Sequence, residues 1–279
     1  MMMRCRSHRI LQVEVSRSCN LECRICMRGN LMQKSGFMSF EDFKKILTCR
    51  FSEVALHGWG EPMLNGDIFR MIAYAKSLGM RTSVTTNGTF VGKYINEILD
   101  SGLDSIAFGY YDTNILMKSI DNLEDLLKER KERGSKLAVY LDITLYKDNR
   151  EEIIRIIKES SEIGVDAAVL HRLFNIYVDS PYETLSSDEE REFFRILREL
   201  GRELRLKIYM PRRHTLPCRI VKNTIFVTYD GKITPCCFLP EYFVGDAHEE
   251  SIESVLKSEK YRKFVKNMEY HDVCSRCIW

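Results

Sequence analysis

Three cysteines near the start of the sequence have a type and spacing that suit metal chemistry. Cys19, Cys23 and Cys26 form a Cys-x3-Cys-x2-Cys pattern. Three thiolates this close together can bind three irons of one cubane cluster, which leaves the fourth iron open to an outside ligand. A zinc site would be closed by a fourth Cys or His at short spacing, whereas the next candidate here is His57. The pattern therefore favours an open iron–sulfur cluster over zinc.

A second group of cysteines lies near the end of the sequence. Its four candidate ligands are Cys218, Cys236, Cys274 and Cys277. The Asp230-Gly231 pair predicts a β-hairpin that brings the first two together, and a final helix over Ser251–Met268 returns the last two. Four thiolates can close a 4Fe–4S cluster or bind zinc, so this segment by itself leaves both open. Cys237 is adjacent to Cys236 and could replace it, although the spacing favours Cys236.

The composition is that of a soluble globular protein: 44% of the residues are apolar and 29% are charged. A net charge of +2 gives no indication of nucleic-acid binding. No run of 18 apolar residues exists, which argues against a membrane span, and no apolar stretch follows the basic segment Met1–Arg9, which argues against a signal peptide. We therefore expect a cytoplasmic protein whose ten cysteines are thiols. Eight of them fall in two clusters suited to metal, whereas Cys5 and Cys49 stand alone.

Short β-rich runs alternate with amphipathic runs from residue 10 onwards. The predicted strands are Ile10–Val15, Glu53–His57, Arg81–Thr85, Ser105–Phe108, Lys136–Leu145 and Ala167–Leu173. The predicted helices are Ser39–Cys49, Ile68–Leu78, Gly92–Asp100, Ser119–Arg133 and Arg150–Ile163. Such β–α repeats predict a parallel sheet with right-handed crossovers, and six repeats are fewer than the eight of a closed TIM barrel.

The predicted fold class is α/β, with a partial (β/α)6 TIM-like barrel followed by a small C-terminal domain of a β-hairpin plus a helix. A charged helix runs to about Arg205, and we place the boundary near residue 210, which gives domains 1–210 and 211–279. Ligands of such sheets bind at the carboxyl ends of the strands. Because the first three cysteines directly follow the first strand, the open cluster should lie at this end of the barrel.

The cysteine trio after the first strand resembles the signature of the radical S-adenosylmethionine (SAM) superfamily. The residue before the third cysteine, usually aromatic in that family, is Ile25 here. His57-Gly58-Trp59-Gly60-Glu61-Pro62 is similar to the family's Gly-Gly-Glu-Pro stretch, with Trp59 at the place of the first glycine. The resemblance implies that the amino group of SAM is bound by Gly58, Trp59, Gly60 and Glu61, and glycines there would allow close approach of the backbone.

Two further strand ends bear on this resemblance. Thr85-Thr86-Asn87-Gly88-Thr89 is also similar to the family, and we expect Thr85 and Asn87 to contact SAM. The fourth strand is followed by Gly109-Tyr110-Tyr111-Asp112, where the family often has Ser-x-Asp-Gly. This difference makes Tyr111 a candidate at the substrate edge.

Two polar residues on later strands complete the predicted substrate pocket. Asp142 shares one face of its strand with Tyr140 and Thr144, and an acid facing the barrel interior would suit a ligand hydroxyl. Arg172 follows His171 near the end of the sixth strand and suits carboxylate or phosphate recognition. For each of these residues a structural role is the alternative.

The C-terminal segment resembles the Twitch/SPASM extension of radical SAM enzymes, which carries auxiliary iron–sulfur clusters. The full SPASM pattern holds two clusters, and the sequence given stops two residues after Cys277. It therefore resembles the shorter Twitch form with one auxiliary 4Fe–4S cluster, and its cysteines are similar to those of 2-deoxy-scyllo-inosamine dehydrogenases and of SPASM maturases.

The resemblance implies an enzyme that reductively cleaves SAM to a 5′-deoxyadenosyl radical, which takes a hydrogen from the substrate. The implied reaction is oxidation, crosslinking or maturation, and the auxiliary cluster would accept an electron. The substrate is a peptide, a sugar-like small molecule or a cofactor precursor, and the electron donor is a low-potential protein such as ferredoxin or flavodoxin. The alternative is a non-catalytic iron–sulfur electron carrier or a zinc-binding protein.

Overall fold

A ten-stranded, mostly parallel sheet forms the centre of the computed structural model, which describes residues 9–47, 51–110, 119–174, 176–177 and 182–278. The strands are β1 (Ile10–Val13), β2 (Glu53–Ala55), β3 (Arg81–Thr86), β4 (Ser105–Tyr110), β5 (Ala138–Leu145), β6 (Ala167–Arg172), β7 (Lys207–Tyr209), β8 (Thr224–Val227), β9 (Lys232–Thr234) and β10 (Gly245–Asp246). Their spatial order is β10-β9-β8-β1-β2-β3-β4-β5-β6-β7. This arrangement confirms the predicted partial barrel.

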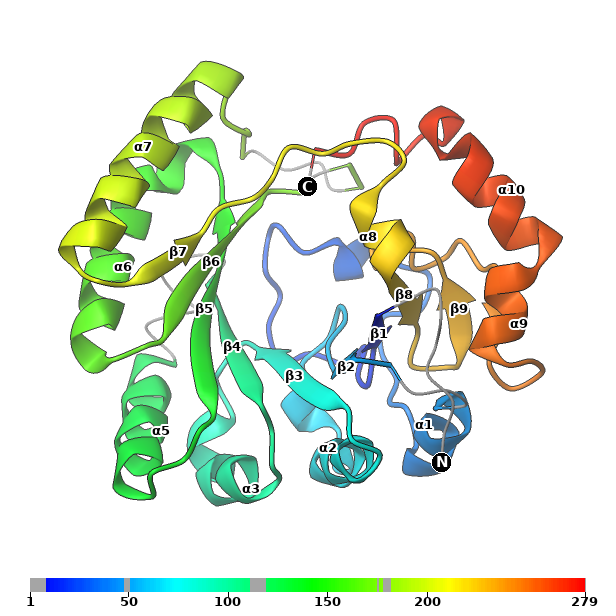
Figure 1. The fold of residues 1–279 in the computed structure, drawn as a ribbon, viewed down its shortest axis with the longest axis horizontal. Coiled ribbons are helices and arrows are strands. Elements are labelled where there is room, and N and C mark those ends of the chain that lie inside the picture. Colours follow the sequence, from blue (N-terminus) through cyan, green and yellow to red (C-terminus); the bar gives the residue numbers. More distant parts are fainter. Residues whose placement is uncertain (1–8, 48–50, 111–118, 175, 178–181, 279) are drawn as a thin grey trace.

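The helices between the first seven strands lie on the outer side of the curved sheet (Figure 1). They are α1 (Phe40–Ile46), α2 (Ile68–Ser77), α3 (Ile95–Asp100), α5 (Ile120–Glu132), α6 (Arg150–Ile163) and α7 (Ser187–Glu203). Short 3-10 turns are η1 (Met27–Asn30), η2 (Pro62–Leu64), η3 (Val91–Tyr94), η4 (Lys147–Asn149) and η5 (Met268–Tyr270). The segment between β1 and α1 lies on the inner side of the curve, coloured blue in Figure 1.

Strand β5 illustrates how the sequence separates the two faces of the sheet. Val139, Leu141 and Ile143 are fully buried in the core beneath the helices. Tyr140 and Asp142, between them, are only half-buried. Because side chains alternate along a strand, the polar set faces the inside of the barrel, as predicted.

The helix ends also follow the sequence. Gly164 ends α6 with φ of 92°, a left-handed conformation that glycine adopts without steric cost. At the start of α7, the Ser186 hydroxyl accepts a hydrogen bond from the backbone N–H of Glu189. The Glu189 carboxylate in turn accepts a hydrogen bond from the backbone N–H of Ser186. This capping box fixes where α7 begins.

The C-terminal hairpin continues the barrel sheet. Strand β8 pairs in parallel with β1, with Ile10 opposite Thr224 and Val13 opposite Val227. Strands β8 and β9 then form the predicted antiparallel hairpin. One buried core likewise includes residues on both sides of residue 210. The predicted domain boundary at that residue stays a prediction.

Two sequence-based expectations for this part were incomplete. Strand β7 pairs in parallel with β6, although its three residues are too few to give a clear β pattern. The single helix predicted over Ser251–Met268 is wrong, because α9 (Ile252–Lys257) and α10 (Glu259–Asn267) are separate. Ser258 between them is extended, with ψ of 154°, and its hydroxyl caps α10 by accepting from the N–H of Tyr261. A short helix, α8 (Arg219–Asn223), follows Cys218.

Among the described residues, no helix is both long enough and apolar enough to cross a membrane.

Candidate functional site

The first three cysteines line a cavity on the inner side of the barrel. Cys19, Cys23 and Cys26 follow β1, and all three are half-exposed in a cavity of about 440 Å³. The N–H of Cys26 donates to the carbonyl of Cys23 at 3.0 Å, and the N–H of Leu21 donates to Sγ of Cys19 at 3.4 Å. Burial raises the pKa of the Cys26 thiol. The cavity walls also include the candidate residues from β2, β3, β5 and β6.

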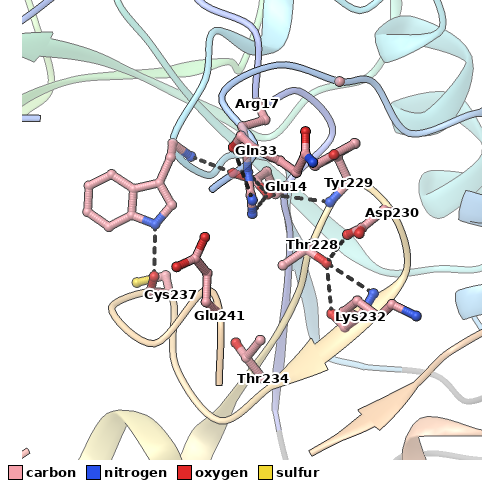
Figure 2. Close-up of polar contacts among 12 residues, drawn as sticks. Glu14, Arg17, Gln33, Thr228, Tyr229, Asp230, Lys232, Thr234, Cys237 and Glu241 are labelled. Atoms are coloured by element: carbon pink, nitrogen blue, oxygen red, sulfur yellow. Dashed lines mark hydrogen bonds and ion pairs between the residues drawn. The ribbon is translucent and has the colours of Figure 1, made fainter. Parts of the chain in front are cut away.

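A buried ion pair fixes the chain between β1 and these cysteines. Both carboxylate–guanidinium hydrogen bonds, from Nε and Nη2 of Arg17 to Oε2 of Glu14, are short, at 3.0 and 2.6 Å. The exposed fractions of the two residues are 0% for Glu14 and 4% for Arg17. Glu14 also accepts from the N–H of Trp59 at 3.1 Å and from that of Tyr229 at 3.4 Å (Figure 2). Burial raises the pKa of Glu14, although Arg17 opposes this effect.

The loop after β2, residues 56–61 and hereafter the β2 loop, packs directly on this segment. The N–H of Glu61 donates to the carbonyl of Ser18 at 2.8 Å. A Cβ on Gly60 would lie within 2.6 Å of the carbonyl carbon of Arg17 and the carbonyl oxygen of Ser18. Only glycine allows this approach without moving the backbone. The β2 loop therefore lies against the residues that precede Cys19.

Glu61 has its carboxylate turned into the protein. Oε1 accepts from the N–H of Met63 at 2.9 Å and from the Thr86 hydroxyl at 2.7 Å, and Oε2 accepts from the N–H of Asn87 at 2.7 Å. Its exposed fraction is 1%, and burial raises its pKa. These contacts make Glu61 a link between the ends of β2 and β3, so the predicted ammonium contact would have to come chiefly from the backbone of the β2 loop.

Asn87 connects the end of β3 to the cysteine segment. Its Nδ2 donates to Oδ1 of Asn20 at 2.9 Å and lies 3.7 Å from Sγ of Cys19. Its Oδ1 accepts from the N–H of Thr89 at 3.0 Å. Thr85 and Asn87 both line the cavity, and their predicted contact with SAM remains a prediction.

Asp142 and His171 form an ion pair inside the cavity, with 2.9 Å between Oδ1 and Nε2. Burial opposes the charged form of His171, but the charge and hydrogen bond of Asp142 outweigh it and raise the pKa of His171 above 6.5. Nearby His57 differs, because burial lowers its pKa to about 4. Its Nδ1 is buried without a hydrogen-bond partner among the described residues. Asp142 thus favours the charged form of His171, whereas burial favours the neutral form of His57.

Arg172 lines the cavity but its guanidinium is committed within the chain. It binds both carboxylate oxygens of Glu190 on α7, at 2.5 and 2.8 Å. It also donates to the carbonyls of Arg212 at 2.8 Å and Ile278 at 3.1 Å. These contacts favour the structural alternative over the predicted substrate contact. The third substrate candidate, Tyr111, lies outside the described residues.

The four C-terminal cysteines lie near one another. Burial raises the pKa of Cys274, and the charges of Cys236, Cys277 and Cys218 raise it further. The N–H of Cys277 donates to the carbonyl of Cys274 at 3.3 Å, and the N–H of Cys218 donates to Sδ of Met268 at 3.2 Å. Cys236, Cys277 and Cys218 thus lie near enough to Cys274 for their charges to act on its pKa, which agrees with the predicted set.

Cys236 and Cys237 have different surroundings. The charge of Cys236 raises the pKa of Cys218, as it does that of Cys274. Cys237 lines the cavity of the first three cysteines instead, and its carbonyl accepts from Nε1 of Trp59 at 2.8 Å (Figure 2). This arrangement supports the assignment of Cys236 rather than Cys237 to the C-terminal set.

The donor sets fit iron–sulfur clusters. Within the described part of the chain, no group of three His, Cys, Asp or Glu residues is placed to hold a single metal ion. Each set consists of thiols, the ligands of 4Fe–4S clusters. The first set has three cysteines beside a cavity, which leaves room for an outside ligand, and the second has four.

Sequence reasoning missed two features of this site. Glu14 and Arg17 gave a signal only as charged residues three apart at the end of an apolar strand. The indole of Trp59 gave none, since its partner Cys237 lies 178 residues further along the chain.

Comparison with known proteins identifies the family. A family model described as "Radical SAM superfamily" matches residues 13–185, more than half of the chain, and a SPASM model described as "Iron-sulfur cluster-binding domain" matches residues 218–278. The chain therefore belongs to the radical SAM superfamily and is an enzyme that uses a 4Fe–4S cluster, SAM and auxiliary iron–sulfur ligation. This result disfavours a non-catalytic electron carrier or zinc protein.

Three relatives show how far the similarity extends. The tungsten-containing aldehyde ferredoxin oxidoreductase cofactor-modifying protein of Pyrococcus furiosus is 22% identical over 311 residues, covering 96% of this chain and 86% of that protein. Streptococcus suis SuiB bound to S-adenosylmethionine has a TM-score of 0.77 at 17% identity, over 93% of this chain and 68% of SuiB. BtrN in complex with AdoMet and 2-DOIA has a TM-score of 0.61 at 18% identity, over 99% and 94%. The two structures establish the fold.

Replacing Gly60 by alanine should disrupt the β2 loop. The new Cβ would overlap backbone atoms of Arg17 and Ser18, and overpacking of this kind costs about 1–3 kcal/mol. We expect Gly60→Ala to lower the free energy of unfolding by that amount and to weaken SAM binding about tenfold or more, measured anaerobically by equilibrium dialysis. Gly66→Ala is the matched control, because a Cβ there meets nothing within 4 Å. Equal SAM affinity in the two variants would contradict the packing argument.

Replacing Asp142 by asparagine should lower the pKa of His171. Burial remains while the carboxylate charge is lost, so the pKa should fall below 6.5, as followed by NMR titration of labelled imidazole. In the wild type the raised pKa stabilises the fold below pH 6.5, and this contribution disappears as the pH rises through the folded-state pKa. Asp142→Asn should therefore destabilise the protein more at pH 6 than at pH 9. The control is Asp104→Asn, which removes an ion pair with Lys76 outside the cavity and should leave the pKa of His171 unchanged. An unchanged pKa of His171 in Asp142→Asn would refute the Asp142–His171 ion pair.

Proposed function

We propose that this radical SAM enzyme is an oxidoreductase or maturase that removes hydrogen from a substrate held in the barrel cavity. Cys19, Cys23 and Cys26 would bind the SAM-cleaving cluster, and the auxiliary cluster would be bound by Cys218, Cys236, Cys274 and Cys277. One observation carries the proposal: a single cavity is lined by the three cysteines, the β2 loop and the Asp142–His171 pair. A volume of about 440 Å³ is in the range of small-molecule sites.

When bound, the cofactors supply a 5′-deoxyadenosyl radical and an electron acceptor, while the chain binds and orients. The backbone of the β2 loop, held by Glu14 and Ser18, would receive the amino group of SAM. Asn87 would fix Cys19 through its side-chain amide. Phe174 and Phe238, stacked with 3.9 Å between ring centroids, line the same cavity and would exclude water from it.

The Asp142–His171 pair would hold a proton in the substrate oxidation. Removing a hydrogen atom and then an electron from a C–H group next to a heteroatom releases one proton, which needs an acceptor. In its neutral form, a histidine whose pKa is raised by a paired carboxylate can accept and store that proton. His57, which burial keeps neutral, adds no competing charge.

A cofactor precursor is the substrate class that we favour. The P. furiosus relative, a cofactor-modifying protein, matches nearly the whole of this chain. A peptide is the second candidate, because SuiB is also known bound to its precursor peptide SuiA with a TM-score of 0.77. A sugar-like molecule is the third. A low-potential ferredoxin or flavodoxin would deliver the electron, in the cytoplasm where thiols stay reduced.

Anaerobic reconstitution tests the core of this proposal. We expect roughly eight irons per chain for two 4Fe–4S clusters, and release of 5′-deoxyadenosine on addition of dithionite and SAM. Replacing Cys19, Cys23 and Cys26 together by alanine should leave about four irons and abolish this product. Iron analysis and chromatography measure both quantities.

Two matched single variants separate the neighbouring cysteines. Cys236→Ala should lose about four irons, whereas Cys237→Ala should keep both clusters. Absence of 5′-deoxyadenosine from a fully loaded wild-type sample would refute the proposed activity. Stimulation of its release by a low-molecular-mass extract fraction rather than a peptide fraction would distinguish the first substrate class from the second.

A further inference from the structure

Trp59 is hydrogen-bonded on two opposite sides. Its backbone N–H donates to Oε1 of Glu14 at 3.1 Å, on the barrel side. Its indole Nε1 donates to the carbonyl of Cys237 at 2.8 Å, on the side of the C-terminal segment. Figure 2 shows both Glu14 and Cys237 within this network. One residue of the β2 loop thus connects two parts of the chain that lie far apart in sequence.

Aromatic packing reinforces the indole contact. The Trp59 ring lies 5.7 Å from that of Phe238, which itself stacks on Phe174 at the end of β6. Offset and tilted ring pairs add about 0.5–1.5 kcal/mol beyond their buried area. The Cys237–Phe238 pair is therefore held against the β2 loop by a hydrogen bond and by ring contacts.

The carbonyl that Trp59 binds belongs to a short, tightly bonded turn. The Cys236 carbonyl, one residue earlier, accepts from the Thr234 hydroxyl at 3.0 Å and from the N–H of Leu239 at 2.9 Å. Within such a turn a shift of Cys236 moves the Cys237 carbonyl with it. Anchoring of Cys236 by a metal cluster would therefore fix the acceptor of the indole.

Glu14 contacts the C-terminal hairpin away from this turn. Glu14 accepts from the N–H of Tyr229 at 3.4 Å and donates its own N–H to the carbonyl of Val227 at 2.8 Å. The Val227 bond continues the backbone pairing of β1 with β8, whereas the Tyr229 bond uses the side chain of Glu14. The Trp59 side chain joins the β2 loop to the cysteine turn, and Phe174 contacts the same turn from the end of β6.

We propose that Trp59 is a positioning residue that couples SAM binding to the state of the auxiliary-cluster segment. The coupling rests on the proposed function, since it takes the β2 loop as the SAM site and Cys236 as an auxiliary ligand. An ordered Cys236 turn fixes the indole, the indole fixes the β2 loop, and the ordered loop binds SAM more tightly. By linkage, bound SAM stabilises the auxiliary segment by the same factor.

A double-mutant cycle on the reconstituted holoenzyme tests the coupling. Trp59→Phe keeps an aromatic ring but removes the indole donor, and Cys236→Ala/Cys274→Ala removes the auxiliary cluster. In the two-cluster background we expect Trp59→Phe to raise the dissociation constant of SAM about three- to tenfold, the equivalent of one hydrogen bond. In the background without the auxiliary cluster, where the affinity is already weakened, the same change should add less than a factor of about two.

The matched control is Tyr261→Phe. It removes a donor of similar geometry, the hydroxyl that binds the carbonyl of Val221 at 3.0 Å, from the same C-terminal region but away from the β2 loop. Its SAM affinity should equal that of the wild type. Phe238→Leu provides a second variant that loosens the contact from the auxiliary side while keeping the indole, and its effect should also disappear without the auxiliary cluster.

A spectroscopic readout complements the affinities. Addition of SAM should change the EPR signal of the reduced auxiliary cluster in the wild type and leave it unchanged in Trp59→Phe. The same factor for Trp59→Phe in both backgrounds, or no effect of Trp59→Phe in the two-cluster enzyme, would overturn the coupling. Failure of the fully loaded wild type to bind SAM would instead refute the proposed function.

Discussion

The site depends on one buried carboxylate. Glu14 has no exposed surface, yet it accepts hydrogen bonds from the cysteine segment through Arg17, from the β2 loop through Trp59 and from the C-terminal hairpin through Tyr229. A buried charge is tolerated only when it is paired and hydrogen-bonded. These three segments therefore have to meet at one point for the fold to form, and that point lies directly before the three cysteines.

The residues that support the site do so by holding loops rather than by reaching into the cavity. Glu61 and Asn87 use their polar groups on neighbouring backbone and side chains, and Arg172 joins β6 to α7. The cavity is consequently surrounded by backbone in fixed positions. Such preorganisation lets glycine-rich loops bind a polar ligand without rearranging, and it explains why bulky side chains are excluded at Gly60.

The sequence predicted the features that are local in the chain. The alternation along β5 and the Asp230-Gly231 hairpin both depend on residues a few positions apart, and the structure has them as expected. Contacts between distant segments could not be read in this way. The Trp59 indole and the Cys237 carbonyl give no local pattern, and Arg172 appeared suited to a ligand because its partner Glu190 lies on another element. The break at Ser258 was missed since serine in an amphipathic run also occurs inside helices.

The pairing of β8 with β1 has a consequence for the order of events during synthesis. Strand β1 leaves the ribosome long before its neighbour on one side, β8, which begins only at Thr224. Until then one edge of β1 has no permanent partner, and the carboxylate of Glu14 lacks the N–H of Tyr229. Contacts of such large sequence separation form late. The cysteine segment that follows β1 would thus reach its final shape only after Thr224–Tyr229 has been made, which places loading of the first cluster after synthesis of this strand.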